Sequence, residues 1–480
     1  MESRRANKRG ATAEAVAVAA EDRLSGLPDD LLHSILRDLP LKHAARTSAL
    51  SRRWASQWLR ALASAPVIDF TDRGFARGQP PARAAVTVSR CLRFHAEHGV
   101  PLHVLRVALG GDGDGAGAFG RDVVGWVADA VASGAREVDV DLMRWQGSDS
   151  DNDHGGLAFL EIPGDLYLAK NSLERLALGG FGLRAVPPGA AGLAGLRSLS
   201  LSHADVTDQA VEAMVSNCGA LEFLSLRRCH QLTSVRITGE KLRVLELVGC
   251  LAVRKLHVAA PALESFAFHG DIVYSSRAPD EDAVAVHFGA TPALRDAYLS
   301  LLGFGDYDDD LHAFAYPNFL ECIAHANILT LCSVGLLVRI YYSVLLILII
   351  RPILSYEINN IYASGAGAAA SPAACEDEPD IISNVDIILD HLTLIKVVNI
   401  RGTRCELRLL RFLLNRAPAL DQLVLVSVEE EGALGDEEMK TIQMRVSAMR
   451  TASPEARVTV CRPREDGSRN SAHTKFYHEE

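Results

Sequence analysis

A glycine-rich run offers the most specific chemistry in the sequence. Gly115 to Gly120 read GAGAFG, which matches GxGxxG, the turn that brings a dinucleotide pyrophosphate onto a helix N-terminus. In that motif the glycines follow a strand directly, whereas here GGDGD intervenes and would put Asp112 and Asp114 beside the phosphates. Carboxylates would repel the phosphates, so we interpret the run as a loop between a strand and a helix. A dinucleotide-binding oxidoreductase remains a remote alternative function.

Metal and disulfide chemistry have little support in the residue pattern. The nine cysteines are an odd number, spread from Cys91 to Cys461 without a CxxC pair. A zinc cluster or a disulfide framework would need paired spacing, so reduced and mostly buried thiols are expected. Asp112 and Asp114 lack the other ligands of a calcium loop. We therefore predict no metal, no cofactor and no catalytic residue.

Length and charge limit how many domains the chain can have and which partners it can attract. With 480 residues it is too long for one compact core, and 48% hydrophobic with 23% charged residues is ordinary globular composition. A net charge of -11 argues against a chain-wide attraction to nucleic acid or anionic membrane. Residues 1–21 are predicted to be a disordered basic and Ala-rich leader. A signal peptide is not expected there, because Glu14 interrupts the apolar core that it would need. The expected location is the nucleus, the cytoplasm or both.

Three short helices are predicted between residues 22 and 62. Pro28 and two aspartates start the first, and leucines recur at helical spacing until Pro40 ends it. A second can run from Leu41 to about Thr47, and Ser51 is placed to cap a third that carries two tryptophans. A segment this small buries little apolar surface by itself, so it is expected to need a partner.

The same segment resembles the F-box at the start of many plant F-box proteins, through its LPDDLLHSILRDLP opening and its TSALSRRW close. The resemblance implies docking on a Skp adaptor, which bridges to a cullin scaffold and its ubiquitin-conjugating machinery. Leu27 and Pro28 precede the helix, where interface anchors tend to be separable from packing, so for these two we favour contact with the partner. The residues implied to form or support the docking face are Leu27, Pro28, Leu31, Ile35, Leu36, Leu39, Leu50, Ser51 and Trp54.

Five copies of LxxLxL follow at a spacing of 21 to 25 residues, and begin at Leu173, Leu196, Leu221, Leu242 and Leu263. This period is typical of a leucine-rich repeat, in which each unit supplies one short strand and no unit can bury its own leucines alone. Weaker units are expected at Leu294 and near residue 330. The segment VTDQAVEAMVSNC is expected to form a helix between two of the strands.

The repeat geometry selects a candidate recognition surface. Strand side chains alternate, so the residues between the leucines point into the concave side of the solenoid. No nucleophile, base and orienting group recur together there, which favours recognition of a protein target over catalysis. An ordinary solvated sheet face is the alternative for any single member. The set is Arg175, Ser198, Ser200, Phe223, Ser225, Arg227, Val244, Glu246, Ser265 and His269.

An apolar stretch from Ile328 to Ile350 has Arg339 as its only charge and is long enough to span a bilayer. A single span would split the repeat core across a membrane, so we favour a buried strand or helix and expect no membrane association. The leucine-repeat pattern is not recognisable immediately beyond this stretch. We hypothesise that residues 336–385 hold an atypical apolar insert, of the kind that retained non-coding sequence would produce, and a Gly/Ala-rich acidic loop.

The segment KVVNIRGTRCELRLLRFLLNRAPALDQLVL resembles the FBD-type unit that closes many plant F-box/leucine-rich-repeat proteins. A strand, a turn at Gly402, an amphipathic helix and a further LxxLxL strand are expected there. Such a unit can cap the solenoid end and be continuous with it. The predicted order is a leader at 1–21, an F-box at 22–62, repeats at 63–335, the insert and loop at 336–385, the FBD-like unit at 386–462 and a disordered tail at 463–480.

The predicted fold class is therefore an α+β or α/β solenoid, a small three-helix F-box followed by a leucine-rich-repeat solenoid of the ribonuclease-inhibitor type. The resemblance implies a non-catalytic substrate receptor of a Skp/cullin/F-box ubiquitin ligase that binds an unknown protein target. An alternative is a leucine-rich-repeat interaction scaffold that does not recruit a ligase.

Overall fold

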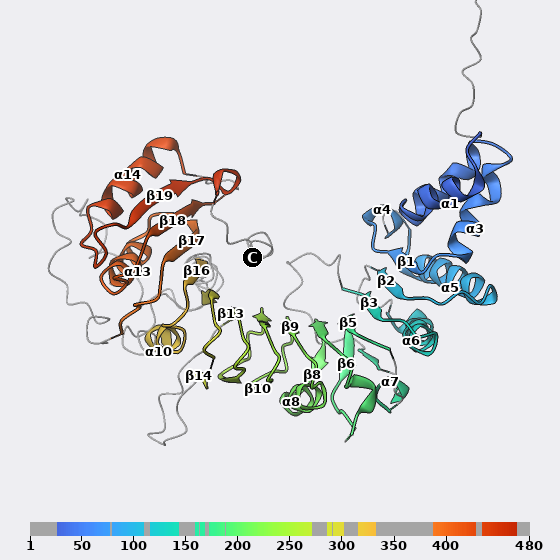
Figure 1. Cartoon of the computed structure of the whole chain (residues 1–480), viewed down its shortest axis with the longest axis horizontal. Coiled ribbons are helices and arrows are strands. Elements are labelled where there is room, and N and C mark those ends of the chain that lie inside the picture. Colours follow the sequence, from blue (N-terminus) through green and yellow to red (C-terminus); the bar gives the residue numbers. More distant parts are fainter. Residues whose placement is uncertain are drawn as a thin grey trace, which may run out of the picture.

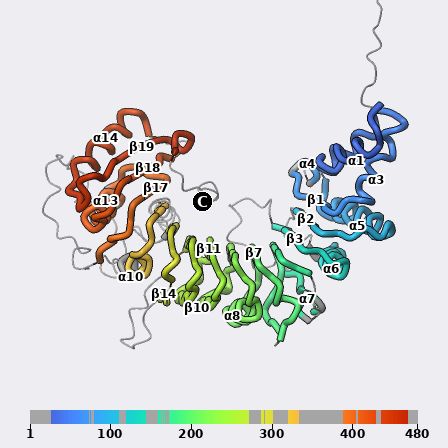
Figure 2. Tube along the Cα trace, viewed as in Figure 1, coloured from blue at the N-terminus to red at the C-terminus, as the bar shows by residue number. Residues whose placement is uncertain are grey.

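A long parallel sheet curves through the chain with a small helical head at its N-terminal end (Figure 1). Figure 2 shows the same path as an open arc, with the N-terminal head and the C-terminal unit at opposite ends. The computed structural model describes residues 26–76, 79–109, 116–143, 159–162, 164–168, 172–187, 189–270, 286–289, 291–301, 315–332, 387–428 and 434–467.

The head contains the predicted short helices. Leu32 and Leu36 lie one helical turn apart on α1 and pack with Ala44, Trp54 and Ala61 into a small separate core. The helical elements are α1 (Asp29–Arg37), α2 (Leu41–Arg46), η1 (Thr47–Ala49), η2 (Trp54–Ser56) and α3 (Gln57–Ala63).

The expected capping role of Ser51 is wrong. The third α-helix begins at Gln57, its N-cap is Ser56, and the Ser56 side chain makes no capping hydrogen bond. The carbonyl oxygen of Ser51 instead accepts a hydrogen bond from the amide of Ala55, one turn before the helix starts. A 3₁₀ turn therefore occupies the place where the sequence indicated the first turn of the helix.

Within the described residues, the repeats form one parallel sheet of 13 strands, which confirms the solenoid and includes the two weaker units. The sheet follows chain order without a reversal. Its strands are β1 (Val67–Phe70), β2 (Val104–Ala108), β3 (Glu137–Asp141), β5 (Arg175–Gly179), β7 (Ser198–Ser202), β9 (Phe223–Arg227), β11 (Val244–Val248), β13 (Ser265–Gly270), β15 (Asp296–Leu301), β16 (Ile328–Cys332), β17 (Leu394–Ile400), β18 (Gln422–Ser427) and β19 (Arg457–Cys461).

The core lies between this sheet and the convex layer. Leu199 and Leu201 of β7, like their counterparts in neighbouring strands, are buried in it because they occupy the alternate strand positions. Cys229 and Cys250 are buried beside them, and each thiol contacts a strand carbonyl oxygen. The repeats therefore share one continuous core, as a solenoid must.

Helices and two small parallel sheets cover the convex side (Figure 1). The expected helix between two repeats is α8, and the Thr207 hydroxyl caps it by accepting the amide of Ala210 at 3.2 Å. The covering elements are α4 (Arg73–Ala76), α5 (Pro81–Glu97), α6 (Ala116–Ala132), α7 (Gly164–Leu168), η4 (Ala191–Leu193), α8 (Asp208–Asn217), α10 (Ala315–Cys322), α13 (Arg404–Leu414), α14 (Asp436–Ser447), the sheet of β4 (Leu160–Glu161), β6 (Phe181–Leu183) and β8 (Asp205–Val206), and the sheet of β10 (Ser234–Thr238), β12 (Lys255–Ala259) and β14 (Val286–Phe288).

The glycine-rich run belongs largely to a helix, so its interpretation as a loop is wrong from Ala116 onward. Helix α6 begins at Ala116, inside GAGAFG. A Cβ on Gly120 would lie 2.5 Å from Cδ2 of Leu160, so this glycine lets α6 pack closely on β4. Dinucleotide sites lie where the strand order of a parallel sheet reverses, and the order from β1 to β19 contains no such reversal. The packing and the topology thus give the dinucleotide alternative no support.

The start of the apolar stretch forms a buried strand, as favoured. Strand β16 takes up Ile328–Cys332, and four of its five residues are buried. Residues 333–350 and the hypothesised insert at 336–385 lie outside the described residues. Among the residues that the structure describes, none of the helices is both long and apolar enough to cross a membrane.

The C-terminal unit continues the repeat sheet. Strand β17 pairs in parallel with β16, with Ile328 opposite Leu394, and β18 and β19 follow in order. A capping box of Thr403 and Glu406 starts α13, and Gly402 adopts a φ of +77° in the preceding turn. The described chain continues past residue 462 into η6 (Pro463–Glu465). The repeats and the C-terminal unit therefore form one body.

A regular charge pattern borders the sheet. In the large sheet, the residue immediately before each strand from β3 to β15 is alternately arginine and glutamate, and from Glu174 onward the amide of each member donates to the carbonyl oxygen of the preceding member at 2.8 to 2.9 Å. Arg197 pairs with Glu222 at 3.3 Å, and Arg243 with Glu264 at 2.9 Å. We call this set the edge ladder: Arg136, Glu174, Arg197, Glu222, Arg243, Glu264 and Arg295.

Candidate functional site

The helical head carries an exposed apolar face. Its four large apolar side chains are far more exposed than is usual for such residues, at 52% for Leu31, 43% for Ile35, 37% for Leu39 and 61% for Leu50. Pro28 is also exposed beside them. We call Pro28, Leu31, Ile35, Leu39 and Leu50 the head face.

Helix α1 explains this exposure. Leu31 and Ile35 are four residues apart and share one side of the helix, whereas Leu32 and Leu36 share another that faces the core of the head. A helix that is apolar on two sides needs a second surface to cover the outer one. No part of the described chain covers the head face.

The structure divides the nine predicted docking residues. Leu36 and Trp54 are buried at 2% and 3% exposure, so they support the head face from below and cannot contact a partner directly. Leu27 and Ser51 are half-buried, and Leu27 packs against the small core. The remaining five predicted residues are those of the head face.

Hydrogen bonds fix the chain that enters α1. The Arg53 guanidinium donates to the carbonyl oxygen of Leu27 at 2.6 Å and to Oδ1 of Asp29 at 2.5 Å. This hydrogen bond from Arg53 holds the pKa of the Asp29 carboxyl below its ordinary value. Leu27 and the first turn of α1 are thereby tied to the third helical segment of the head.

The predicted concave residues do not form one open surface. Arg175 is exposed, and Ser198, Ser200, Phe223, Arg227, Val244 and His269 are half-buried. Ser225, Glu246 and Ser265 occupy the same side of their strands but are buried at 1%, 3% and 8% exposure, so they offer no open surface to a target. The strand register places Ser200, Ser225 and Glu246 in one row across β7, β9 and β11. Ser200 is half-buried and the other two are buried, so in this row the concave side becomes inaccessible between β7 and β9.

The concave side of the C-terminal half is largely buried, and it holds an apolar cluster together with buried polar residues such as Ser300 and Thr330. A second apolar cluster runs from β11 to β19 on this side of the sheet, separate from the repeat core. Lys396 of β17 is completely buried there, and its Nζ lies 2.6 Å from Oδ2 of Asp466, just beyond η6. The chain after β19 therefore returns over the concave side of β17. The cluster consists of Val248, Ala267, Tyr298, Cys332, Val398, Val424, Val426 and Cys461.

A charged network lies on the concave side next to the head. Nε of Arg106 donates to Oε1 of Glu137 at 2.8 Å, and a second guanidinium nitrogen lies 3.6 Å from Oδ2 of Asp69. The hydrogen bond to Glu137 raises the pKa of Arg106. Arg175 lies 3.9 Å from the other Glu137 oxygen, so the network crosses β1, β2, β3 and β5. All four side chains point away from the core.

Three members of this network were missed because the sequence pattern was read from Leu173 onward. Asp69, Arg106 and Glu137 precede the first LxxLxL unit, in strands that alternate in burial but lack the LxxLxL pattern. The alternation of VIDF, VLRVA and EVDVD is a signal that could have identified them.

Comparison with known proteins agrees with both parts of this arrangement. The F-box domain family model matches residues 24–61, which include α1, α2 and most of α3. The family model for the leucine-rich repeats of FBD-associated F-box protein At5g56370 matches residues 123–306. The chain carries an F-box and leucine-rich repeats of the FBD-associated type.

Individual relatives support the same assignment. The chain is 26% identical over 256 residues to F-box/LRR-repeat protein At3g03360 and 29% identical over 209 residues to FBD-associated F-box protein At5g60610, both from Arabidopsis thaliana. These matches cover 50% and 42% of this chain and 46% and 45% of the relatives, so the chain spans less than half of their length. A shorter match of 121 residues to F-box/FBD/LRR-repeat protein At5g22700 is 36% identical.

The matched segments coincide with the two candidate surfaces. The head face belongs to the F-box, and Arg175 lies within the matched repeats. Strands β1 and β2 precede the repeat match, although they continue its sheet. The F-box therefore joins the repeats through strands that already have the repeat geometry.

Proposed function

We propose that this protein is a substrate receptor of a Skp/cullin/F-box ubiquitin ligase, acting in the nucleus or the cytoplasm. The F-box binds a Skp adaptor through the head face, and the repeats bind a protein target. The observation that carries the proposal is the exposed apolar head face, because it belongs to a matched F-box and nothing in the described chain covers it.

The physical contribution of such a receptor is binding free energy alone. A few well-buried apolar anchors can supply most of the affinity of an interface, and burying a leucine or isoleucine side chain yields roughly 1.5 to 3 kcal/mol. A target held on the same rigid body is then presented to the conjugating machinery at high effective concentration. No catalytic group of the receptor is needed for this.

We further propose that the target contacts the open, N-terminal part of the concave side. The network of Asp69, Arg106, Glu137 and Arg175 is polar and borders the F-box, while the concave side beyond β11 is filled by apolar packing. A charged and polar target surface fits this part best, since complementary charges give specificity and rapid association.

Assembly tests the proposal. The full chain, a purified Skp adaptor and a cullin are expected to elute together in size-exclusion chromatography. Ile35→Asp should abolish this complex because it puts a charge into the buried interface. Ile388→Asp is the matched control, since Ile388 is 66% exposed and lies outside the F-box.

Failure of the wild-type chain to join the adaptor would overturn the ligase function and leave the interaction-scaffold alternative. Equal assembly of Ile35→Asp and wild type would show that the head face is not the docking surface.

A further inference from the structure

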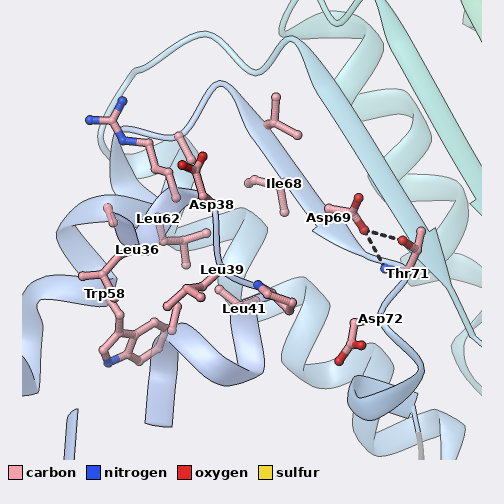
Figure 3. A pocket seen from close by; sticks show the side chains of 16 residues that line it. Leu36, Asp38, Leu39, Leu41, Trp58, Leu62, Ile68, Asp69, Thr71 and Asp72 are labelled. Atoms are coloured by element: carbon pink, nitrogen blue, oxygen red, sulfur yellow. Dashed lines mark hydrogen bonds between the residues drawn. The ribbon is translucent and has the colours of Figure 1, made fainter. Parts of the chain in front are cut away.

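Two places outside the head face gather polar groups that no earlier step has used. The hollow between the F-box and β1 is lined by Asp38, Asp69 and Asp72 (Figure 3). Oδ1 of Asp69 already accepts the amide and the hydroxyl of Thr71 at 2.7 and 2.6 Å, and an acidic lining alone gives no reason to expect a ligand. The second place is the outer sheet of β10, β12 and β14 on the convex side, where two histidines meet (Figure 1).

His257 of β12 and His287 of β14 lie side by side on this sheet. The parallel register places them directly opposite each other, and their ring centroids are 4.9 Å apart with 17° between the ring planes. Their strand neighbours Leu256, Val258 and Val286 are buried, so the alternation of the strands puts both imidazoles on the outer face. His287 is exposed there and His257 is half-buried. We call these two residues the histidine pair.

The spacing of the two rings suits joint binding of one metal ion. When two imidazoles bind the same ion in neighbouring positions, at nitrogen–metal distances of about 2.0 to 2.1 Å, their ring centroids are roughly 4.5 to 5.2 Å apart. The observed separation of 4.9 Å falls within this range. Both rings lie at the surface, so a change in their side-chain torsion angles can turn one nitrogen of each ring toward a common ion.

The ring nitrogens are available as ligands. Within the part of the chain that the structure describes, no hydrogen bond or ion pair engages either ring. Partial burial, the Arg236 guanidinium and His287 lower the pKa of His257. Its imidazole is therefore largely neutral at neutral pH, which is the form that binds a metal ion.

The charged neighbours of the pair favour one class of metal ion. Arg236 of β10 lies opposite His257 in the same row, and its Nε is 3.8 Å from Oε1 of Glu212. Lys255 precedes His257 by two residues on the same face of β12. Ca²⁺ and Mg²⁺ need several oxygen ligands, whereas imidazole nitrogens suit Cu²⁺, Ni²⁺ and Zn²⁺. The donor set is therefore that of a late transition-metal ion.

We propose that the histidine pair binds one late transition-metal ion, with Cu²⁺ held more tightly than Ni²⁺ or Zn²⁺. No cluster of three or more metal-binding side chains occurs among the described residues, so water fills the remaining positions. The ion joins β14, a strand of three residues, to β12. The prediction of no metal depended on cysteine and aspartate spacing, which does not mark a pair formed by two separate strands.

The Cu²⁺ complex of iminodiacetate is a suitable probe, because its chelator occupies part of the coordination sphere and leaves room for two imidazoles. Electron paramagnetic resonance of the full chain titrated with this complex should show a site with two protein nitrogens on the copper. His257→Gln and His287→Gln should each weaken that binding about tenfold or more, because the second imidazole no longer acts at high effective concentration.

His391→Gln is the matched control, since His391 is an exposed histidine outside the pair. It should bind the copper complex as wild type does, and thermal melts should show that all variants fold. A wild-type spectrum with only one protein nitrogen on the copper would overturn the proposal. Unchanged copper binding by a folded variant of either histidine would do so as well. If one of these two variants fails to fold, the other decides.

Discussion

Neighbouring side chains on α1 have opposite roles. Leu32 is completely buried in the small core of the F-box, while Leu31 is exposed on the head face. Helical periodicity gave the spacing of both leucines but not the orientation of the helix relative to its neighbours. The F-box resemblance placed Leu36 and Trp54 among the residues that form or support the docking face, and their burial assigns them to the supporting part.

Substitutions of Leu31 and Leu32 should distinguish a contribution to folding stability from a contribution to partner binding. Leu32→Ala should lower the free energy of unfolding by roughly 2 to 5 kcal/mol, because it leaves a cavity in the core. Leu31→Ala should change it by about 0.5 kcal/mol or less, because the side chain is exposed. Chemical denaturation followed by circular dichroism measures both, and equal losses would contradict the assignment of the two faces.

The ion pair of Asp29 with Arg53 predicts that the stability of the F-box depends on pH. Since the folded-state pKa of Asp29 is lowered, the pair should stabilise the F-box fully above the unfolded-state pKa of Asp29. This contribution is lost as the pH falls through the lowered folded-state value.

Comparing wild type with Asp29→Asn by chemical denaturation checks the direction. The stability difference should be present at neutral pH and vanish in strong acid, where Asp29 of the wild type is protonated in both the folded and the unfolded state. A difference that grows as the pH falls would contradict the prediction.

At the scale of the element, the strands were the most predictable part of the chain. Each LxxLxL unit became a strand, because leucines at alternate positions must face a shared core. The small outer sheet of β10, β12 and β14 was missed although SVRIT and KLHVA alternate in burial, since no leucine pattern marks them. The start of α6 was misplaced because glycine and alanine carry little helical periodicity.

The edge ladder gives each repeat neighbours of opposite charge. Arg197→Glu would place three carboxylates in consecutive positions, between Glu174 and Glu222, where they repel. The free energy of unfolding should fall by about 1 kcal/mol, and the loss should shrink as salt screens the charges.

Chemical denaturation at low and high salt checks this prediction. Arg445→Glu on α14 serves as a control, since this exposed arginine lies outside the ladder. A loss for Arg197→Glu that matches the control, or that is independent of salt, would count against a stabilising role for the ladder.

At the scale of the whole molecule, one sheet joins the repeats to the C-terminal unit. The sequence indicated this continuity through the returning LxxLxL pattern. It could not indicate that the concave side is closed beyond β11, because the contact of Lys396 with Asp466 joins residues 70 positions apart. Burial of Ser225 and Glu246 likewise depends on contacts that strand alternation does not encode.

The contact of Lys396 with Asp466 should matter for the stability of this end of the solenoid. Asp466→Ala removes a charge partner of a completely buried ammonium group and should cost roughly 3 kcal/mol. Asp390→Ala, at an exposed site, should cost much less. Denaturant unfolding monitored by amide hydrogen exchange in β17 and β18 measures the loss, and similar values for the two variants would contradict the prediction.

The proposed function depends on binding of a Skp adaptor to the head face of the F-box. The most direct measurement is a calorimetric titration of the adaptor into the full chain, its Leu31→Ala/Ile35→Ala variant and the exposed control Met444→Ala. We predict saturable binding by wild type and by the control, and a loss of about 2 kcal/mol or more, at least a tenfold weaker affinity, for the double variant. Absence of binding by wild type, or unchanged affinity of a folded double variant, would contradict the account.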